Sequence, residues 1–132
     1  MTPAPDTAGV LLASEALSLA FQRRDLTAAL ECFADDDELA YIGSESGERA
    51  IGRPAITALL RDLFGRPEAY SWRLTEPIVW TRGDLAGLCS EAVGQAQSAN
   101  GSEEFAYRLT GTLERINHTW RWRICHGSEP TP

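Results

Sequence analysis

The chain has 132 residues, of which 43% are hydrophobic and 23% charged, a composition typical of one ordinary globular domain. Its net charge of −7 excludes nucleic acid as an expected partner, because no excess of Lys and Arg could neutralise phosphates, and argues against an anionic membrane surface. No apolar stretch approaches the roughly 18 residues of a membrane span, and no signal peptide is evident. These properties predict a compact protein without nucleic-acid or membrane partners.

The three cysteines are far apart, odd in number and form no CxxC motif. The sequence therefore predicts neither a disulfide framework nor a zinc site. Free thiols favour a reducing, cytoplasmic location. The acidic run "DDDE" lacks the glycine and the oxygen-ligand spacing of a calcium loop, so we expect no metal and no cofactor.

The first half of the chain is predicted to be helical after a flexible leader over residues 1–9. Apolar residues at helical spacing predict a helix over 10–24, and Asp25 is placed to cap a short second helix. A strand over 39–42 leads into a turn rich in Gly and Ser. Pro54 then suits the first position of a third helix, because its missing N–H would be unsatisfied there anyway.

The second half changes to the alternating pattern of β-strands. Strands are expected over four ranges: 70–81, interrupted at Pro77, 85–98, 105–116 and 119–126. The predicted fold class is α+β, with three N-terminal helices packed on a curved antiparallel sheet that forms a cone with an apolar pocket. The domain is expected to span residues 10–128, followed by a short tail over 129–132.

Strand alternation also predicts which side chains face the helices. The inward residues of the second long strand are unusually small, which leaves space inside the cone: Leu88, Ser90, Ala92, Gly94 and Ala96. In the last strand the same rule turns four residues inward, Trp120, Trp122, Ile124 and His126, and turns Cys125 outward with the arginines. The outer face, which carries Glu91, Arg108, Arg121, Arg123 and several threonines, suits water or a second copy of the sheet.

Five segments together resemble the SnoaL-like branch of the nuclear transport factor 2-like superfamily, which has a cystatin-like cone fold. They are "RRDLTAALECFADD", "YIGSESGERAIGRPAITALL", "RGDLA", "RLTGTLERI" and "WRICHGSEP", in this order. The resemblance implies a homodimer built through the outer sheet face and an apolar pocket for a small molecule. Members include polyketide cyclases, ketosteroid isomerases, dehydratases and the association domain of calcium/calmodulin-dependent protein kinase II.

The residues at the catalytic positions do not match those of the ketosteroid isomerases, one of the enzyme groups that the resemblance implies. The position of the base falls on Tyr41, the oxyanion-hole tyrosine falls near Leu17, and no Asp faces inward from the sheet. Glu76, beside the Pro77 break, is the one carboxylate expected near the inner face. The candidate catalytic residues are therefore Tyr41 and His126, although Tyr41 also fits as a core tyrosine and His126 as a partner of a backbone group.

Three functions stay open from the sequence. The first is binding of a small apolar molecule in the pocket, without a clear catalytic carboxylate. The second is an isomerase, cyclase or dehydratase-like lyase that uses Tyr41 and His126, and the third is an oligomerisation module without chemistry. The residues expected to contact a ligand are Tyr41, Trp72, Ser90, Tyr107, Trp122 and His126.

Overall fold

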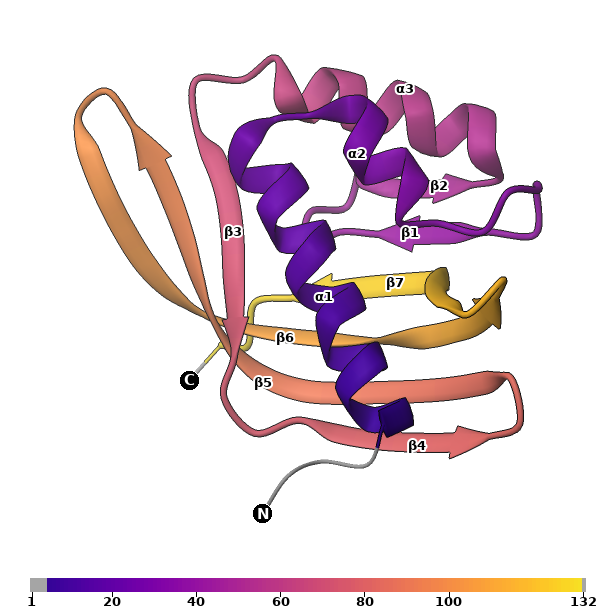
Figure 1. Ribbon diagram of the computed structural model, residues 1–132. Coiled ribbons are helices and arrows are strands. Elements are labelled where there is room, and N and C mark those ends of the chain that lie inside the picture. Colours follow the sequence, from indigo (N-terminus) through magenta and orange to yellow (C-terminus); the bar gives the residue numbers. More distant parts are fainter. Residues whose placement is uncertain (1–4, 132) are drawn as a thin grey trace.

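The computed structural model describes residues 5–131, which form helices packed on a bent sheet (Figure 1). The helices are α1 (Pro5–Arg23), α2 (Leu26–Glu31) and α3 (Arg53–Phe64). The strands are β1 (Ala40–Ile42), β2 (Arg49–Ile51), β3 (Ala69–Leu74), β4 (Ile78–Arg82), β5 (Leu85–Ser98), β6 (Gly101–Ile116) and β7 (Thr119–Ser128). The predicted α+β class is confirmed, and so is the Asp25 cap, whose carboxylate accepts from the Ala28 N–H (3.1 Å).

The sheet has the strand order β2-β1-β7-β6-β5-β3, and β4 also pairs with β5. All pairs are antiparallel, as predicted, except β1 with β7, which is parallel. The reason is the segment that follows α2. Its backbone exchanges hydrogen bonds with Trp122 through the Cys32 carbonyl (2.8 Å) and the Ala34 N–H (3.0 Å), which guides β1 along β7 in the same direction.

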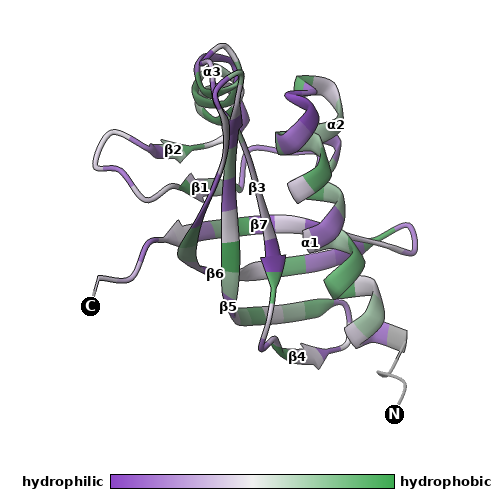
Figure 2. Ribbon diagram, turned by 90° about the vertical axis from the view of Figure 1, so that its left-hand side faces the viewer, coloured by the Kyte–Doolittle hydropathy of each residue, from purple (hydrophilic) through white to green (hydrophobic). Residues whose placement is uncertain are grey.

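Strand β5 pairs with two different strands along its length. Its first half pairs with β4 and its second half with β3, and Pro77 lies between the two partners. The sheet bends between these halves, and α1 crosses its concave side (Figure 1). Figure 2 shows α1 and α2 on one face of the sheet, while no helix within residues 5–131 covers the opposite face. The interior of the bend is therefore enclosed by strands on one side and by helices on the other.

The predicted inward faces of β5 and β6 are confirmed by burial. Leu88, Ser90 and Ala92 of β5 and Leu109 and Leu113 of β6 are all buried. Outward residues of the same strands form exposed ion pairs, as between Arg108 and Glu91 (2.6 Å). The alternating pattern of these two strands was therefore sufficient to orient them.

Helix α1 begins earlier than the sequence suggested. Residues 5–9, assigned to a flexible leader, are helical, and residues 1–4 of that leader lie outside the described residues. The side chain of Asp6 accepts a hydrogen bond from Arg115 Nη1 (2.6 Å), and Gly9 lies against the Trp120 ring. Contacts with β6 and β7, which local periodicity does not reveal, thus extend the helix towards the N-terminus.

A β-bulge in the last strand overturns part of the predicted orientation. Leu113 pairs with Trp122, but its neighbour Thr112 pairs with Ile124, so Arg123 is an extra residue. Trp120 and Trp122 face inward as expected. Beyond the bulge the alternation reverses, because a one-residue shift exchanges the two faces.

The reversal changes which of the last three residues, Ile124, Cys125 and His126, are buried. Cys125 is buried, whereas Ile124 and His126 are exposed. The predictions that His126 and Ile124 face the interior and that Cys125 faces outward were therefore wrong.

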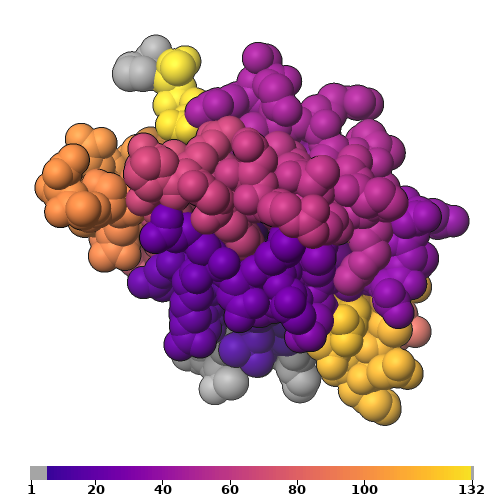
Figure 3. All heavy atoms as spheres, turned by 90° about the horizontal axis from the view of Figure 1, so that it is seen from above, coloured from indigo at the N-terminus to yellow at the C-terminus, as the bar shows by residue number. Residues whose placement is uncertain are grey.

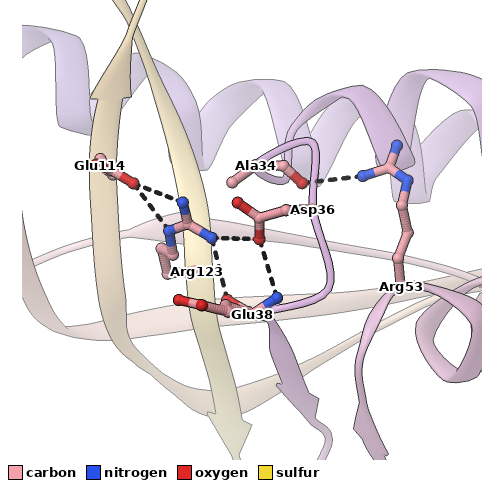
Figure 4. Close-up of polar contacts among 6 residues, drawn as sticks. All are labelled: Ala34, Asp36, Glu38, Arg53, Glu114 and Arg123. Atoms are coloured by element: carbon pink, nitrogen blue, oxygen red, sulfur yellow. Dashed lines mark hydrogen bonds and ion pairs between the residues drawn. The ribbon is translucent and has the colours of Figure 1, made fainter.

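Arg123 is held on the outer side of the bulge by acidic groups (Figure 4). Its guanidinium donates to Glu114 (2.7 and 2.9 Å), to Asp36 (2.5 Å) and to the Glu38 carbonyl (3.2 Å). Close by, Arg53 of α3 donates to the Ala34 carbonyl (3.0 Å), so two guanidinium groups fix the acidic segment between α2 and β1. The "DDDE" run is thereby a structural element with arginine partners.

Candidate functional site

The cone contains a small cavity between α1, α3, the bent sheet and the loop that joins β1 to β2. Its volume is about 80 Å³. The lining residues are Phe21, Tyr41, Ser44, Glu45, Glu48, Leu63, Arg66, Tyr70, Ser71, Trp72, Phe105, Tyr107 and Glu129. The cavity therefore has an aromatic inner part and a polar mouth.

The aromatic rings come from elements that are distant in the sequence. Trp72 of β3 is the central ring, with its centroid 5.1 Å from that of Phe21 in α1 and 6.1 Å from that of Tyr107 in β6. Phe21 lies 6.0 Å from Tyr41 of β1, and Tyr107 lies 5.9 Å from Phe105. These separations fall in the range of attractive aromatic pairs, so the rings support one another as a rigid wall.

Two serines of α1 fix Trp72. The Ser18 hydroxyl accepts from the Trp72 N–H (2.9 Å) and donates to its carbonyl (2.8 Å), and the indole Nε1–H donates to Ser14 Oγ (3.1 Å). Both serines are buried. Their hydrogen bonds satisfy polar groups that would otherwise be costly to bury, and they orient the indole at the cavity.

The polar mouth is formed by the β1–β2 loop and the end of the chain. Glu48 is only 8% exposed, and its Oε1 accepts from the Glu45 N–H (3.1 Å). The side chain folds over Gly43, where a Cβ would lie 2.6 Å from Oε1. Ser44 donates to Glu129 Oε2 (2.7 Å), and Figure 3 shows the yellow C-terminal segment beside this purple loop. Glycine at position 43 thus allows a carboxylate to reach the cavity.

Burial controls the ionisation of the two cavity tyrosines. Burial first, and then the neighbouring Tyr107, Cys125 and Glu48, hold the pKa of Tyr41 well above its usual range. The pKa of Tyr107 is also raised, again first by burial and then by Cys125, Glu48 and Glu129. Both phenols therefore remain protonated at neutral pH, when they can donate hydrogen bonds but cannot act as bases.

The structure divides the six residues expected to contact a ligand into two groups. Tyr41, Trp72 and Tyr107 all line the cavity. Ser90 and Trp122 are buried but do not line it, since Ser90 Oγ donates to the Glu91 carbonyl (2.6 Å) and Trp122 packs in the core. His126 is exposed on the outer side of β7, so Tyr41 and His126 do not meet in one site.

The sequence analysis missed the carboxylates of the mouth. Glu76, the one acidic side chain expected near the inner face, is exposed and does not line the cavity. The buried carboxylate is instead Glu48, from a segment interpreted only as a turn. The sole sequence signal is a Glu placed directly before the short strand β2, and such a residue is ordinarily solvated.

Two features are absent from the described residues, a metal-binding group and a helix that could span a membrane. No group of three or more His, Cys, Asp or Glu side chains within residues 5–131 is arranged to hold a metal ion. Within the same part of the chain, no helix is both long and apolar enough to cross a membrane. What the cavity offers is an aromatic wall, phenol donors and carboxylate acceptors.

A bent sheet packed on one long helix, with a cavity between them that opens at a polar mouth, defines a cone-fold protein of the cystatin-like type. Residues 10–132 match the SnoaL-like domain, and the chain belongs to this family, as the five segments of its sequence indicated. The sequence matches no curated protein.

Solved structures share the fold at low sequence identity. A proposed dehydratase from the NTF2-like family of Streptomyces avermitilis is 16% identical, with a TM-score of 0.84 over 99% of this chain and 100% of that one. A proposed aromatic ring hydroxylase of Novosphingobium aromaticivorans is 18% identical, with a TM-score of 0.83 over 100% and 94% of the chains. A proposed calcium/calmodulin-dependent protein kinase type II association domain of Thiobacillus denitrificans is 21% identical, with a TM-score of 0.72 over 99% and 98%. At these identities the likeness concerns the fold alone.

Proposed function

We propose that this protein binds a small organic molecule in the cone cavity, with the aromatic wall around its apolar part and polar groups at its mouth. The observation that carries the proposal is the Tyr41 hydroxyl. The side chain is 6% exposed and lines the cavity, and its hydroxyl has no hydrogen-bond partner among the described residues. No fully buried polar atom of these residues lacks a partner, so this hydroxyl is open to the cavity. A phenol that faces a cavity and has no protein partner can donate a hydrogen bond to a bound molecule or to water.

The four tryptophans offer a direct test, because they lie in different places. Trp72 lines the cavity, Trp120 and Trp122 are in the core, and Trp80 is exposed on β4. We expect fragments that bind the cavity to shift the indole ¹⁵N–¹H signal of Trp72 and to leave that of Trp80 unchanged. Each signal is assigned by one Trp→Phe variant.

The Tyr41→Phe variant completes this test. For a fragment with a polar group, loss of the hydroxyl should weaken binding by roughly fivefold to tenfold, the usual effect of one neutral hydrogen bond. Fragments that shift Trp80 alone, or that bind Tyr41→Phe as tightly as the native protein, would contradict the proposed site.

One observation favours an enzymatic alternative, a lyase or isomerase. Glu48 supplies a buried carboxylate at the cavity, and Tyr41 supplies a phenol donor, which are the two groups needed to remove a proton beside a carbonyl and to stabilise the resulting oxygen anion. The similarity of fold to a proposed dehydratase is compatible with this chemistry. His126 has no part in it, since its side chain lies outside the cavity.

This alternative has its own test. Glu48→Gln should abolish solvent deuterium exchange into a bound carbon acid while the Trp72 signal still reports binding. Exchange that persists in Glu48→Gln would exclude Glu48 as the base.

We further propose a homodimer in the cytoplasm. The uncovered face of the sheet carries both charges and apolar groups, including the exposed Ile78, Trp80 and Ile124, a mixture that supports a self-complementary interface. The free cysteines Cys32, Cys89 and Cys125 support a reducing compartment.

A further inference from the structure

We propose that the ligand of this cavity is an organic cation, a small molecule with a protonated amine or a quaternary ammonium group that enters between the carboxylates of the mouth and the aromatic wall. This inference rests on the proposed binding function and names the chemical class of the ligand.

The first argument is the charge of the lining. Three carboxylates line the cavity, Glu45, Glu48 and Glu129, against one guanidinium, Arg66. Arg66 already faces an acidic partner outside the lining, Asp62 (3.4 Å). Within the described residues none of the three carboxylates forms an ion pair. The site therefore has an excess of negative charge, which repels an anionic ligand and attracts a cationic one.

The second argument is the burial of Glu48. This residue is 8% exposed, and its carboxylate has one hydrogen bond in the described structure, accepted by Oε1 from the Glu45 N–H. Oε2 has no hydrogen-bond partner in the described structure, and it is accessible from the cavity, which the residue lines. A buried carboxylate normally has an opposite charge or several donors beside it, so a cation at this place would supply what the protein does not.

The third argument is the wall itself. Trp72, Tyr107 and Phe21 surround the inner part of the cavity, and the faces of such rings attract cations through their quadrupoles. A metal ion does not fit this environment, since the acidic residues of the described chain do not gather into a metal-binding group. An organic cation fits both the rings and the carboxylates.

The size of the cavity limits the buried part of the ligand. A volume of about 80 Å³ is roughly half that of a cavity known to hold benzene, which has six heavy atoms. The buried part of a ligand therefore has about three heavy atoms, as in the three methyl groups of a tert-butyl group, and the rest lies at the mouth. Three molecules with the same tert-butyl group are suitable probes: tert-butylammonium, tert-butanol and pivalate. They differ in charge and hardly in shape.

The experiment measures the dissociation constant of each probe from the shift of the Trp72 indole signal at pH 7 and low salt. We expect tert-butylammonium to bind about tenfold more tightly than tert-butanol, and pivalate to bind most weakly. In Glu48→Gln this preference for the cation should disappear, because the affinity for tert-butylammonium falls more than that for tert-butanol. Glu129→Gln, a change in a more exposed residue, should reduce the preference in part, and Glu103→Gln, outside the cavity, should have no effect.

Each outcome separates this inference from the proposed function. If tert-butanol and tert-butylammonium bind equally, or if pivalate binds best, the cavity binds small molecules but the inference about charge is wrong. If none of the three shifts Trp72, both are overturned. Should Glu48→Gln fail to fold, Glu129→Gln decides, because an unchanged preference for the cation in that variant would contradict the role of the mouth.

Discussion

Gly111 of β6 permits the bulge that orients the end of β7, and replacing it with alanine tests this directly. A Cβ at position 111 would lie 2.7 Å from Cζ3 of Trp122, and still closer to the carbonyl oxygen of Ile124. Non-bonded carbon atoms normally approach to about 3.5–4.0 Å, so this Cβ would lie about 1 Å too close to the ring. The carbonyl belongs to the backbone next to the bulge and cannot rotate away as a side chain would.

The expected change in the free energy of unfolding of Gly111→Ala is the difference between two opposing effects. Overpacking against a rigid neighbour costs about 1–3 kcal/mol, whereas the loss of glycine from a strand returns about 0.5–1 kcal/mol. We expect a net loss of about 1–2 kcal/mol in the free energy of unfolding, or a fall in Tm of roughly 4–8 °C for a chain of this size. Because Trp122 is fully buried, the Ile124 carbonyl and the bulge must absorb most of the strain.

The matched control is Gly87→Ala in the neighbouring strand β5, where a Cβ would meet no atom within 4 Å. Urea unfolding, followed by tryptophan fluorescence at one fixed protein concentration, measures both variants. Gly87→Ala should be neutral or slightly stabilising. If the two variants are equally stable, Gly111 does not accommodate the bulge, and the explanation for the outward position of His126 loses its steric basis.

Three further results are expected. Sedimentation should give twice the 14.5 kDa chain mass at micromolar concentration, and a monomer would contradict the proposed dimer. Burial raises the pKa of Cys32 to about 11 and also raises that of Cys125, so alkylation at pH 8 should modify the exposed Cys89 first, as read by peptide mass spectrometry; equal rates would refute this order. The hydrogen bond from Arg123 chiefly lowers the pKa of Asp36 below 3.8, which stabilises the fold above that pH and is lost on acidification. Asp36→Asn should therefore destabilise the protein at pH 7 but not near ~pH 2, and an equal loss at both would exclude this linkage.

The parts of the fold that could be predicted from the sequence are those governed by local pattern. The long strands β5 and β6 alternate without interruption, and Asp25 and Pro54 mark helix starts by their own chemistry. Which side chains at the end of β7 face inward depends instead on the bulge, which lies against Gly111 of strand β6. A period-two pattern in one strand cannot contain that information.

The candidate site was predictable only where it lies on regular strands. Tyr107 lies on the face that alternation turned inward, and Tyr41 lines the cavity at the position that the family resemblance indicated. Trp72, also expected to contact a ligand, lines the same cavity. Glu48 could not be found in this way. Its side chain reaches the cavity by folding over Gly43, and this arrangement is a property of the closed β1–β2 loop.

The contact between Ser44 and Glu129 has a practical consequence for how this protein is handled. Glu129 lies at the cavity mouth, three residues before the last residue of the sequence. Charged groups fused within a few residues of Glu129 are within reach of this entrance, and the imidazolium groups of a polyhistidine tail would compete for its carboxylates. Biosensor immobilisation and affinity columns for ligand discovery should therefore use the N-terminal side. The first residue of α1, Pro5, lies at the opposite end of this helix from Phe21, which lines the cavity.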